Sequence, residues 1–211
     1  MRPQRNRNAI VYTGGMAIDA DGCPFAYHPG GGGLDAIGNA GHPGDYYGVV
    51  TDTGEPTGTP IVQGPGDPFP GGWVAQTALV DRTKSRRDPG RYADAQTVPY
   101  ASIARDLLHA PLELGDVAVV GYRGIWCGAI VAEVGPAHKY GEGSIALADR
   151  LAIPPIGKVR GRGVDNGVTW LIFPGSAQTP AWPRTVADFQ AQADALFEIF
   201  GGPAAVASLI S

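Results

Sequence analysis

A pair of glutamates stands out in the segment AEVGPAHKYGEGS, where Glu133 and Glu142 are nine residues apart. Hydrolysis of a glycosidic bond needs two such groups, one that keeps its proton as a general acid and one that is ionised to activate water or attack carbon. Nine extended residues span about 30 Å, so the glycines and the proline between them must fold the segment back if both carboxyls face one substrate. The spacing alone is more typical of two solvated surface acids.

A second group of polar residues lies nearer the N-terminus, in the stretches IDADG, AYHP and GGLDA. Asp19 and Asp21 have the spacing that begins an EF-hand calcium loop, but the three residues after Gly22 offer no side-chain oxygens. An Asx turn between strands is the simpler interpretation. The four histidines show no HxH or HExxH spacing, and neither Ser144 nor Ser176 stands in a G-x-S-x-G motif. We therefore expect no bound metal, no cofactor and no serine nucleophile.

Strands separated by wide loops are the elements that must position these residues. The chain contains 32 glycines and 19 prolines, a bias typical of loop-rich, strand-based domains rather than helical bundles. Runs of β-branched and aromatic residues bounded by Gly or Pro predict strands at residues 9–17, 46–51, 73–80, 98–104, 117–121, 125–133 and 168–173. Arg123-Gly124 predicts a tight hairpin turn. Glu133 is thus expected at the end of a strand.

Two helices are expected in addition. Ser144 can cap a short helix directly after the second acid, and Pro154-Pro155 forbids its continuation. Near the C-terminus, Thr185 can cap a longer amphipathic helix that Gly201 ends. The expected fold class is therefore mainly β (α+β).

Length and charge bound the class of protein further. The 211 residues fit a single domain covering 1–211, and a monomer is expected. A net charge of -4 with 17% charged residues leaves no basic footprint for nucleic acid, and no apolar run is long enough for a membrane span. The start, MRPQRNRNAIVY, lacks the apolar stretch of a secretory signal, and export by another route stays open. Cys23 and Cys127 are compatible with one disulfide or two free thiols.

Several motifs, taken in order, resemble one known family. YTGGMAIDADGCPFAYHP, GGGLDAIGNAG, IVQGPGDPFPGGWVAQTALVD, TVPYASI, AEVGPAHKYGEGSIALADRLAI and VTWLIFPGS follow one another along nearly the whole chain. They resemble the chitosanases of glycoside hydrolase family 75 and their bacterial relatives. The resemblance is most specific in the segment that carries the two acids and the following helix, so it favours a catalytic pair over two surface acids.

The resemblance implies a barrel-like core of about six strands, of which the double-psi barrel is one form. It also implies an inverting mechanism with Glu133 and Glu142 as the two essential acids. Glu142 matches the family's glutamate, whereas Glu133 stands where the family has an aspartate. We expect Glu142 to act as general acid and Glu133 as base. Four further residues that recur in the family are expected to line the substrate cleft, namely Asp19, Asp21, His28 and Asp35.

The expected function is endo-acting hydrolysis of chitosan or a related amino-sugar polymer, with the polysaccharide as the partner. Cleavage of peptidoglycan glycan strands is the alternative within enzymes. Acidic side chains in the cleft favour cationic chitosan, and Lys or Arg there favours peptidoglycan. A third alternative is a non-catalytic carbohydrate-binding or phage-like structural module, which predicts acids that lie far apart or point outward. The added methylene at Glu133 keeps it open, since a shift of about 1 Å can cost about 100-fold in rate.

Overall fold

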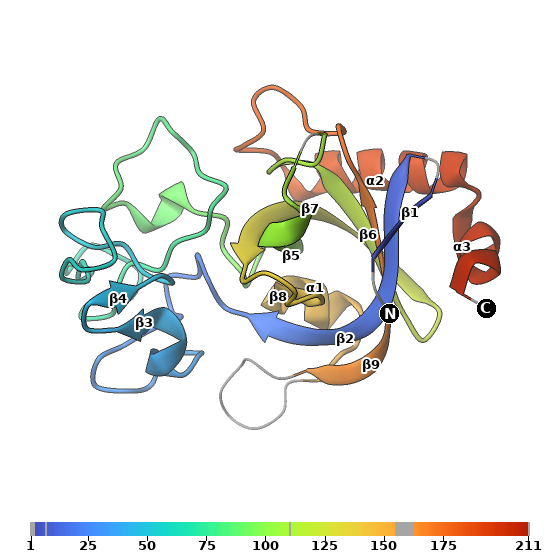
Figure 1. Ribbon diagram of the computed structural model, residues 1–211. Coiled ribbons are helices and arrows are strands. Elements are labelled where there is room, and N and C mark those ends of the chain that lie inside the picture. The colour runs from blue at the N-terminus through green and yellow to red at the C-terminus, as the bar shows by residue number, and fades with distance from the viewer. Residues whose placement is uncertain (1–2, 7, 110, 155–162, 211) are drawn as a thin grey trace.

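The structure is a computed structural model that describes residues 3–6, 8–109, 111–154 and 163–210 (Figure 1). Its strands are β1 Gln4–Asn6, β2 Ala9–Asp19, β3 Gly41–His42, β4 Asp45–Tyr46, β5 Tyr100–Ala104, β6 Val117–Tyr122, β7 Ile125–Gly135, β8 Glu142–Ser144 and β9 Val164–Phe173. Seven of them form one sheet in the order β1-β2-β8-β5-β7-β6-β9. A further pairing between β2 and β9 closes six strands into a barrel, which confirms the expected mainly-β fold with a six-stranded core.

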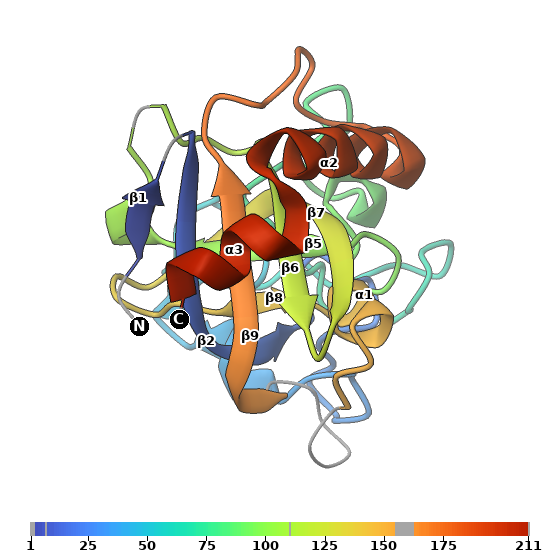
Figure 2. The same cartoon turned by 90° about the vertical axis from the view of Figure 1, so that its right-hand side faces the viewer.

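Three α-helices and three short 3₁₀ helices complete the fold of the described residues. They are α1 Ile145–Arg150, α2 Val186–Phe200 and α3 Gly202–Ile210, with single 3₁₀ turns η1 Ile37–Ala40, η2 Pro89–Arg91 and η3 Arg105–Leu107. Figure 2 shows α2 and α3 crossing the outer face of the sheet. In the described part of the chain no single helix is long and apolar enough to cross a membrane. Only α2 and α3 taken together, bent by 63°, meet the length and composition test.

The barrel combines parallel and antiparallel pairs of strands. The pairs β2–β8 and β5–β7 are parallel, whereas β5–β8, β6–β7, β6–β9 and β2–β9 are antiparallel. Because β8 lies between β2 and β5, a strand of only three residues is hydrogen-bonded on both edges. The double-psi form of the barrel stays a prediction.

Large aromatic and aliphatic side chains fill the core. The rings of Tyr12 and Trp170 stack with centroids 6.0 Å apart, and both residues are buried. Both come from the paired strands β2 and β9, where they are direct register partners. Cross-strand aromatic pairs of this kind stabilise a sheet beyond the area they bury.

Local sequence signals explain most element ends. Arg123 and Gly124 adopt positive φ angles of 48° and 84°, which gives the tight turn between β6 and β7 that the sequence predicts. Ser144 accepts from the N–H of Leu147 and caps α1, and Thr185 accepts from that of Asp188 and caps α2. Gly201 ends α2 in the left-handed conformation. These caps confirm both expected helices.

Two expected strands are wrong in detail. Residues 46–51 and 73–80 contribute isolated bridges, such as Val49 with Ala75 and Val62 with Trp73, instead of continuous strands. They belong to a long loop region, residues 20–99, that lies beside the barrel in Figure 1 and also contains β3 and β4. Val50, Ile61, Val74 and Tyr92 form a small apolar cluster within this region, and other apolar residues of the region pack into the main core. The sequence pattern did not predict β1, β8 or α3.

Candidate active site

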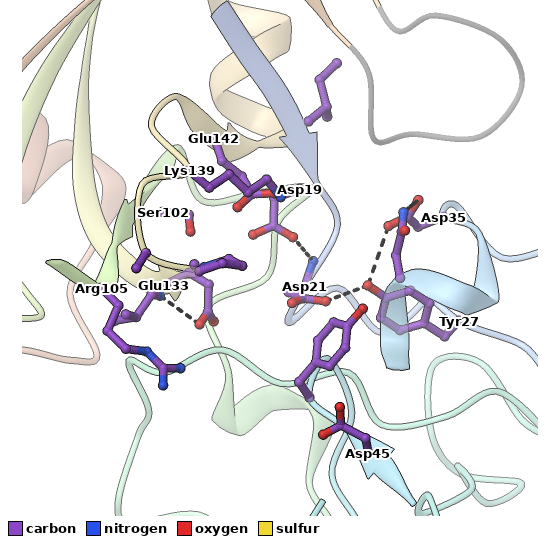
Figure 3. Close-up of a pocket in the computed structure, with 17 residues that line it drawn as sticks. Asp19, Asp21, Tyr27, Asp35, Asp45, Ser102, Arg105, Glu133, Lys139 and Glu142 are labelled. Atoms are coloured by element: carbon purple, nitrogen blue, oxygen red, sulfur yellow. Dashed lines mark hydrogen bonds and ion pairs between the residues drawn. The ribbon is translucent and has the colours of Figure 1, made fainter. Parts of the chain in front are cut away.

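A cleft of about 710 Å³ lies between the barrel and the loop region 20–99. Its lining carries six carboxyl groups and two cations, Lys139 and Arg105, so it is predominantly acidic. Figure 3 shows how the side chains of its two sides face each other. We call these sides the barrel wall, made of Asp19, Ser102, Glu133 and Glu142, and the loop wall, made of Asp21, Tyr27, Asp35, Asn39, Asp45 and Tyr47.

Glu133, Ser102 and Glu142 form one row across three adjacent strands. Ser102 on β5 is the register partner of Glu133 on β7 and, at its other edge, of Glu142 on β8. Directly paired residues point to the same face of a sheet, so the three side chains share one wall. Neighbouring strands lie about 4.8 Å apart, which puts the backbones of the two glutamates about 9 to 10 Å from each other.

Backbone donors hold the carboxyl of Glu133. Its Oε2 accepts from the N–H of Ala78 and its Oε1 from that of Val134, both at 2.8 Å. Leu79, which follows Ala78, donates its N–H to the carbonyl of Ala132 at 2.9 Å, and this bond ties the loop to β7. Burial, and next the charge of Asp19, raises the pKa of Glu133 to about 8. Glu133 therefore holds a proton at neutral pH.

Glu142 has a different environment. The Lys139 ammonium lies 2.6 Å from its Oε1. This ion pair favours the carboxylate form of Glu142. Burial alone would lower the pKa of Lys139, but the surrounding carboxylates, Glu142 foremost, raise it. Gly141 places the start of β8, where Glu142 stands, against β2. Its carbonyl accepts from the N–H of Ala17 at 2.9 Å, and a Cβ at its φ of 88° would lie 2.3 Å from the carbonyl oxygen of Gly15.

The loop that carries Lys139 is tied down by Asp106. The carboxylate of Asp106 accepts from the backbone N–H of His138 at 2.7 Å and from the hydroxyl of Tyr140 at 2.5 Å. These bonds lower the pKa of Asp106 to about 2. His138 also lies 3.2 Å from the same carboxylate through its ring, and its side chain is largely exposed. His138 therefore anchors the loop outside the cleft lining.

Asp19 on the barrel wall and Asp21 on the loop wall are neighbouring acidic residues of the cleft. The backbone N–H of Asp21 donates to Oδ1 of Asp19 at 2.8 Å, which is the expected Asx turn. Burial, and next the charge of Glu142, raises the pKa of Asp19 to about 7. Burial and the charge of Asp19 also raise that of Asp21 well above its usual value. A cation that enters the cleft lowers these pKa values, so both carboxyl groups then lose a proton and become negatively charged.

Tyr27 joins Asp21 to Asp35 on the loop wall. Its hydroxyl donates to Oδ1 of Asp21 at 2.6 Å and lies 3.5 Å from Oδ2 of Asp35. The other oxygen of Asp35 accepts from Ala36 N–H and the Asn39 amide at 2.8 and 2.9 Å. Burial nevertheless raises the pKa of Asp35. The result is a hydrogen-bonded acidic network.

Five of the six candidate residues meet in this cleft, and His28 does not line it. The ring of His28 packs against Phe69 at 5.2 Å between centroids, and its Nδ1 accepts from the N–H of Gly30. His28 directly follows Tyr27, whose side chain lines the cleft, so the motif lies in a loop of the site although the ring of His28 is outside the lining.

The aromatic residues divide between core and cleft. Tyr12 and Trp170 are buried, and Trp126 packs against Phe197 of α2, so none of them is available to a sugar ring. Tyr47 is different. It lines the cleft and is 59% exposed.

Sequence reasoning missed several residues of the site. Lys139 lies inside the acid-bearing segment, and its spacing of three residues from Glu142 was a usable signal. Ser102 gave no signal, since its place between the acids depends on strand register. The other missed residues are Arg105, Asn39 and Asp45.

Comparison with known proteins identifies no family for this chain. No family model matches the sequence, and no curated protein is significantly similar to it. Among the residues that the structure describes, no group of three or more His, Cys, Asp or Glu side chains is arranged to hold a metal ion. Cys23 and Cys127 are buried free thiols. What remains is an acidic cleft with two differently placed glutamates on one rigid wall.

Proposed function

We propose that this protein is an endo-acting glycoside hydrolase related to the family 75 chitosanases, and that it cleaves chitosan or a related amino-sugar polymer. One observation carries the proposal. Glu133 and Glu142 lie on one wall of one cleft with a single strand between them. The backbone separation of about 9 to 10 Å favours inversion, for which the carboxyls stand roughly 6.5 to 9.5 Å apart to admit a water molecule.

The surroundings of the two acids favour roles opposite to those expected from the sequence. Glu133 has a pKa raised to about 8 by burial and Asp19, so it has a proton to give to the leaving oxygen. Glu142 lies against the Lys139 ammonium as a carboxylate, 2.6 Å away, and is suited to take a proton from water. We therefore assign Glu133 as general acid and Glu142 as general base.

The charge of the cleft supports a cationic polymer. Six carboxyl groups line it, and Lys139 is already paired with Glu142. An amino-sugar ammonium that enters beside Asp19 and Asp21 meets two side chains whose raised pKa values fall when a cation approaches. Arg105 is the feature of the lining that favours the alternative, peptidoglycan.

Reducing-end release from soluble chitosan, chitin and peptidoglycan tests the proposal. We expect release from chitosan, and a loss of at least about 1,000-fold in Glu142→Gln, because the base is then absent. Glu198→Gln, an exposed glutamate on α2, is the matched control and should keep full activity. Release from peptidoglycan alone favours the alternative enzyme. No release from any polymer favours a non-catalytic module.

A further inference from the structure

The hydroxyl of Ser102 has no hydrogen-bond partner in the described part of the chain, although the residue is 1% exposed. A buried hydroxyl without a partner costs about 1 to 3 kcal/mol of stability, so such groups are uncommon and call for an explanation. Ser102 lies in the row between the two glutamates and lines the cleft. A small polar molecule that enters from the cleft is the partner it lacks.

Gly135 leaves space for such a molecule. A Cβ at position 135 would lie 3.2 Å from Oε2 of Glu142 and 3.4 Å from Oγ of Ser102. The two oxygens therefore face the same spot, beside a residue that has no side chain to fill it. They do not hydrogen-bond to each other, and one molecule the size of water can contact both.

The rest of Glu142 is already engaged. Its Oε1 is bound to Lys139 at 2.6 Å, which leaves Oε2 as the oxygen directed to Ser102 and Gly135. The two oxygens of this carboxylate therefore have separate tasks. Lys139 fixes the orientation of the carboxylate, and Oε2 is available to accept a proton.

We propose that Ser102, Glu142 and the bare Cα of Gly135 form the site of the attacking water, an inference that rests on the proposed function. One O–H of the water is directed to Oε2 of Glu142 and the other to Oγ of Ser102, which turns a lone pair toward the anomeric carbon. When the C–O bond to the water forms, its proton passes to Glu142. The bond to the leaving oxygen breaks, and that oxygen receives the proton of Glu133. Ser102 orients the water and exchanges no proton.

Two substitutions test this water site, one by removing a hydrogen-bond partner of the water and one by occupying its space. Ser102→Ala removes the hydroxyl, and Gly135→Ala puts a methyl group where the water sits. We expect each to lower kcat on chitosan by about 100-fold while KM changes less than about two-fold, as for the loss of one oriented hydrogen bond at a reacting atom. Ser208→Ala on α3 is the matched control and should leave kcat unchanged.

The double variant and the melting temperature separate orientation of water from a structural role. Both substitutions displace the same water, so Ser102→Ala with Gly135→Ala should be no more than about three-fold slower than either alone. Because Ser102→Ala breaks no hydrogen bond within the described part of the chain, its melting temperature should stay the same or rise. Multiplicative losses in kcat, a lowered melting temperature or a kcat of wild-type size in Ser102→Ala would overturn the assignment. If wild-type protein releases no reducing ends from any polymer, the proposed function falls as well.

Discussion

The barrel wall and the loop wall of the cleft hold their carboxyl groups in different ways. On the barrel wall, strand register fixes Glu133, Ser102 and Glu142 in one row, and their backbones are bonded into the sheet. On the loop wall, side chains hold one another, with Tyr27 between Asp21 and Asp35. A sheet fixes positions through many cooperative backbone bonds, whereas a side-chain network shifts when one member is lost.

This difference suggests a division of work between the two walls. Bond cleavage requires that reacting groups be placed within a fraction of an ångström, which favours residues on rigid strands. Recognition of a long, variable polymer tolerates adjustment, which favours loops. We therefore expect substitutions on the barrel wall to lower kcat, and substitutions on the loop wall to raise KM.

The largest effect is expected at Glu133. Glu133→Gln removes the proton donor, and kcat on chitosan should fall by about 1,000-fold. Glu133→Asp restores the residue type of the resembling family, yet the shorter side chain no longer reaches the N–H of Ala78 that Oε2 now contacts at 2.8 Å. A loss of about 100-fold is expected for it. Initial rates over a substrate series measure both, and an Asp variant faster than wild type would contradict this reason.

A smaller effect is expected at Tyr27. Tyr27→Phe removes the hydroxyl that donates to Asp21 at 2.6 Å, so Asp21 and Asp35 are no longer connected through this residue. A hydrogen bond to a charged group contributes about 1.5 kcal/mol, so KM should rise by about ten-fold while kcat stays within about two-fold. Tyr122→Phe, at the end of β6, is the control. A fall in kcat with unchanged KM would remove the division between the walls.

A further effect is expected on stability rather than on the reaction rate. Glu133 has a pKa of about 8 in the fold and 4.5 as its ordinary value, so the folded protein binds this proton more tightly than the unfolded chain. Stability from this group is complete below pH 4.5 and is lost as the pH rises toward 8, by about 3 kcal/mol between pH 5 and pH 8. Urea unfolding at pH 5 and pH 8 measures the loss, which Glu133→Gln should reduce. A wild-type protein more stable at pH 8 would contradict the raised pKa.

The sequence predicted elements with strong local signals and missed those that depend on distant partners. Caps and turns identified the two predicted helices and the hairpin, because Ser144, Thr185 and Gly124 act on their own neighbours. Strand β8 carries no such signal. Its three residues are held by pairing with β2 and β5, which come from far away in the chain.

The same reason explains which site residues were found. The acids at 133 and 142 were predicted from a motif within one segment, and Asp19, Asp21 and Asp35 from the resemblance. Ser102 lies 31 residues before Glu133, and only the parallel register of β5 with β7 brings them together. The roles of the two acids were also not predictable, since Lys139 and burial decide them.

The anomeric form of the first product tests the central claim most directly. Proton NMR can follow the reducing end released from soluble β-linked chitosan oligomers before mutarotation. The backbones of the two acids lie about 9 to 10 Å from each other, which leaves room for a water molecule between the carboxyls. This water attacks from the face opposite the leaving oxygen, so the α anomer should appear first. A β anomer as the first product, or no product from wild-type protein, would contradict the account.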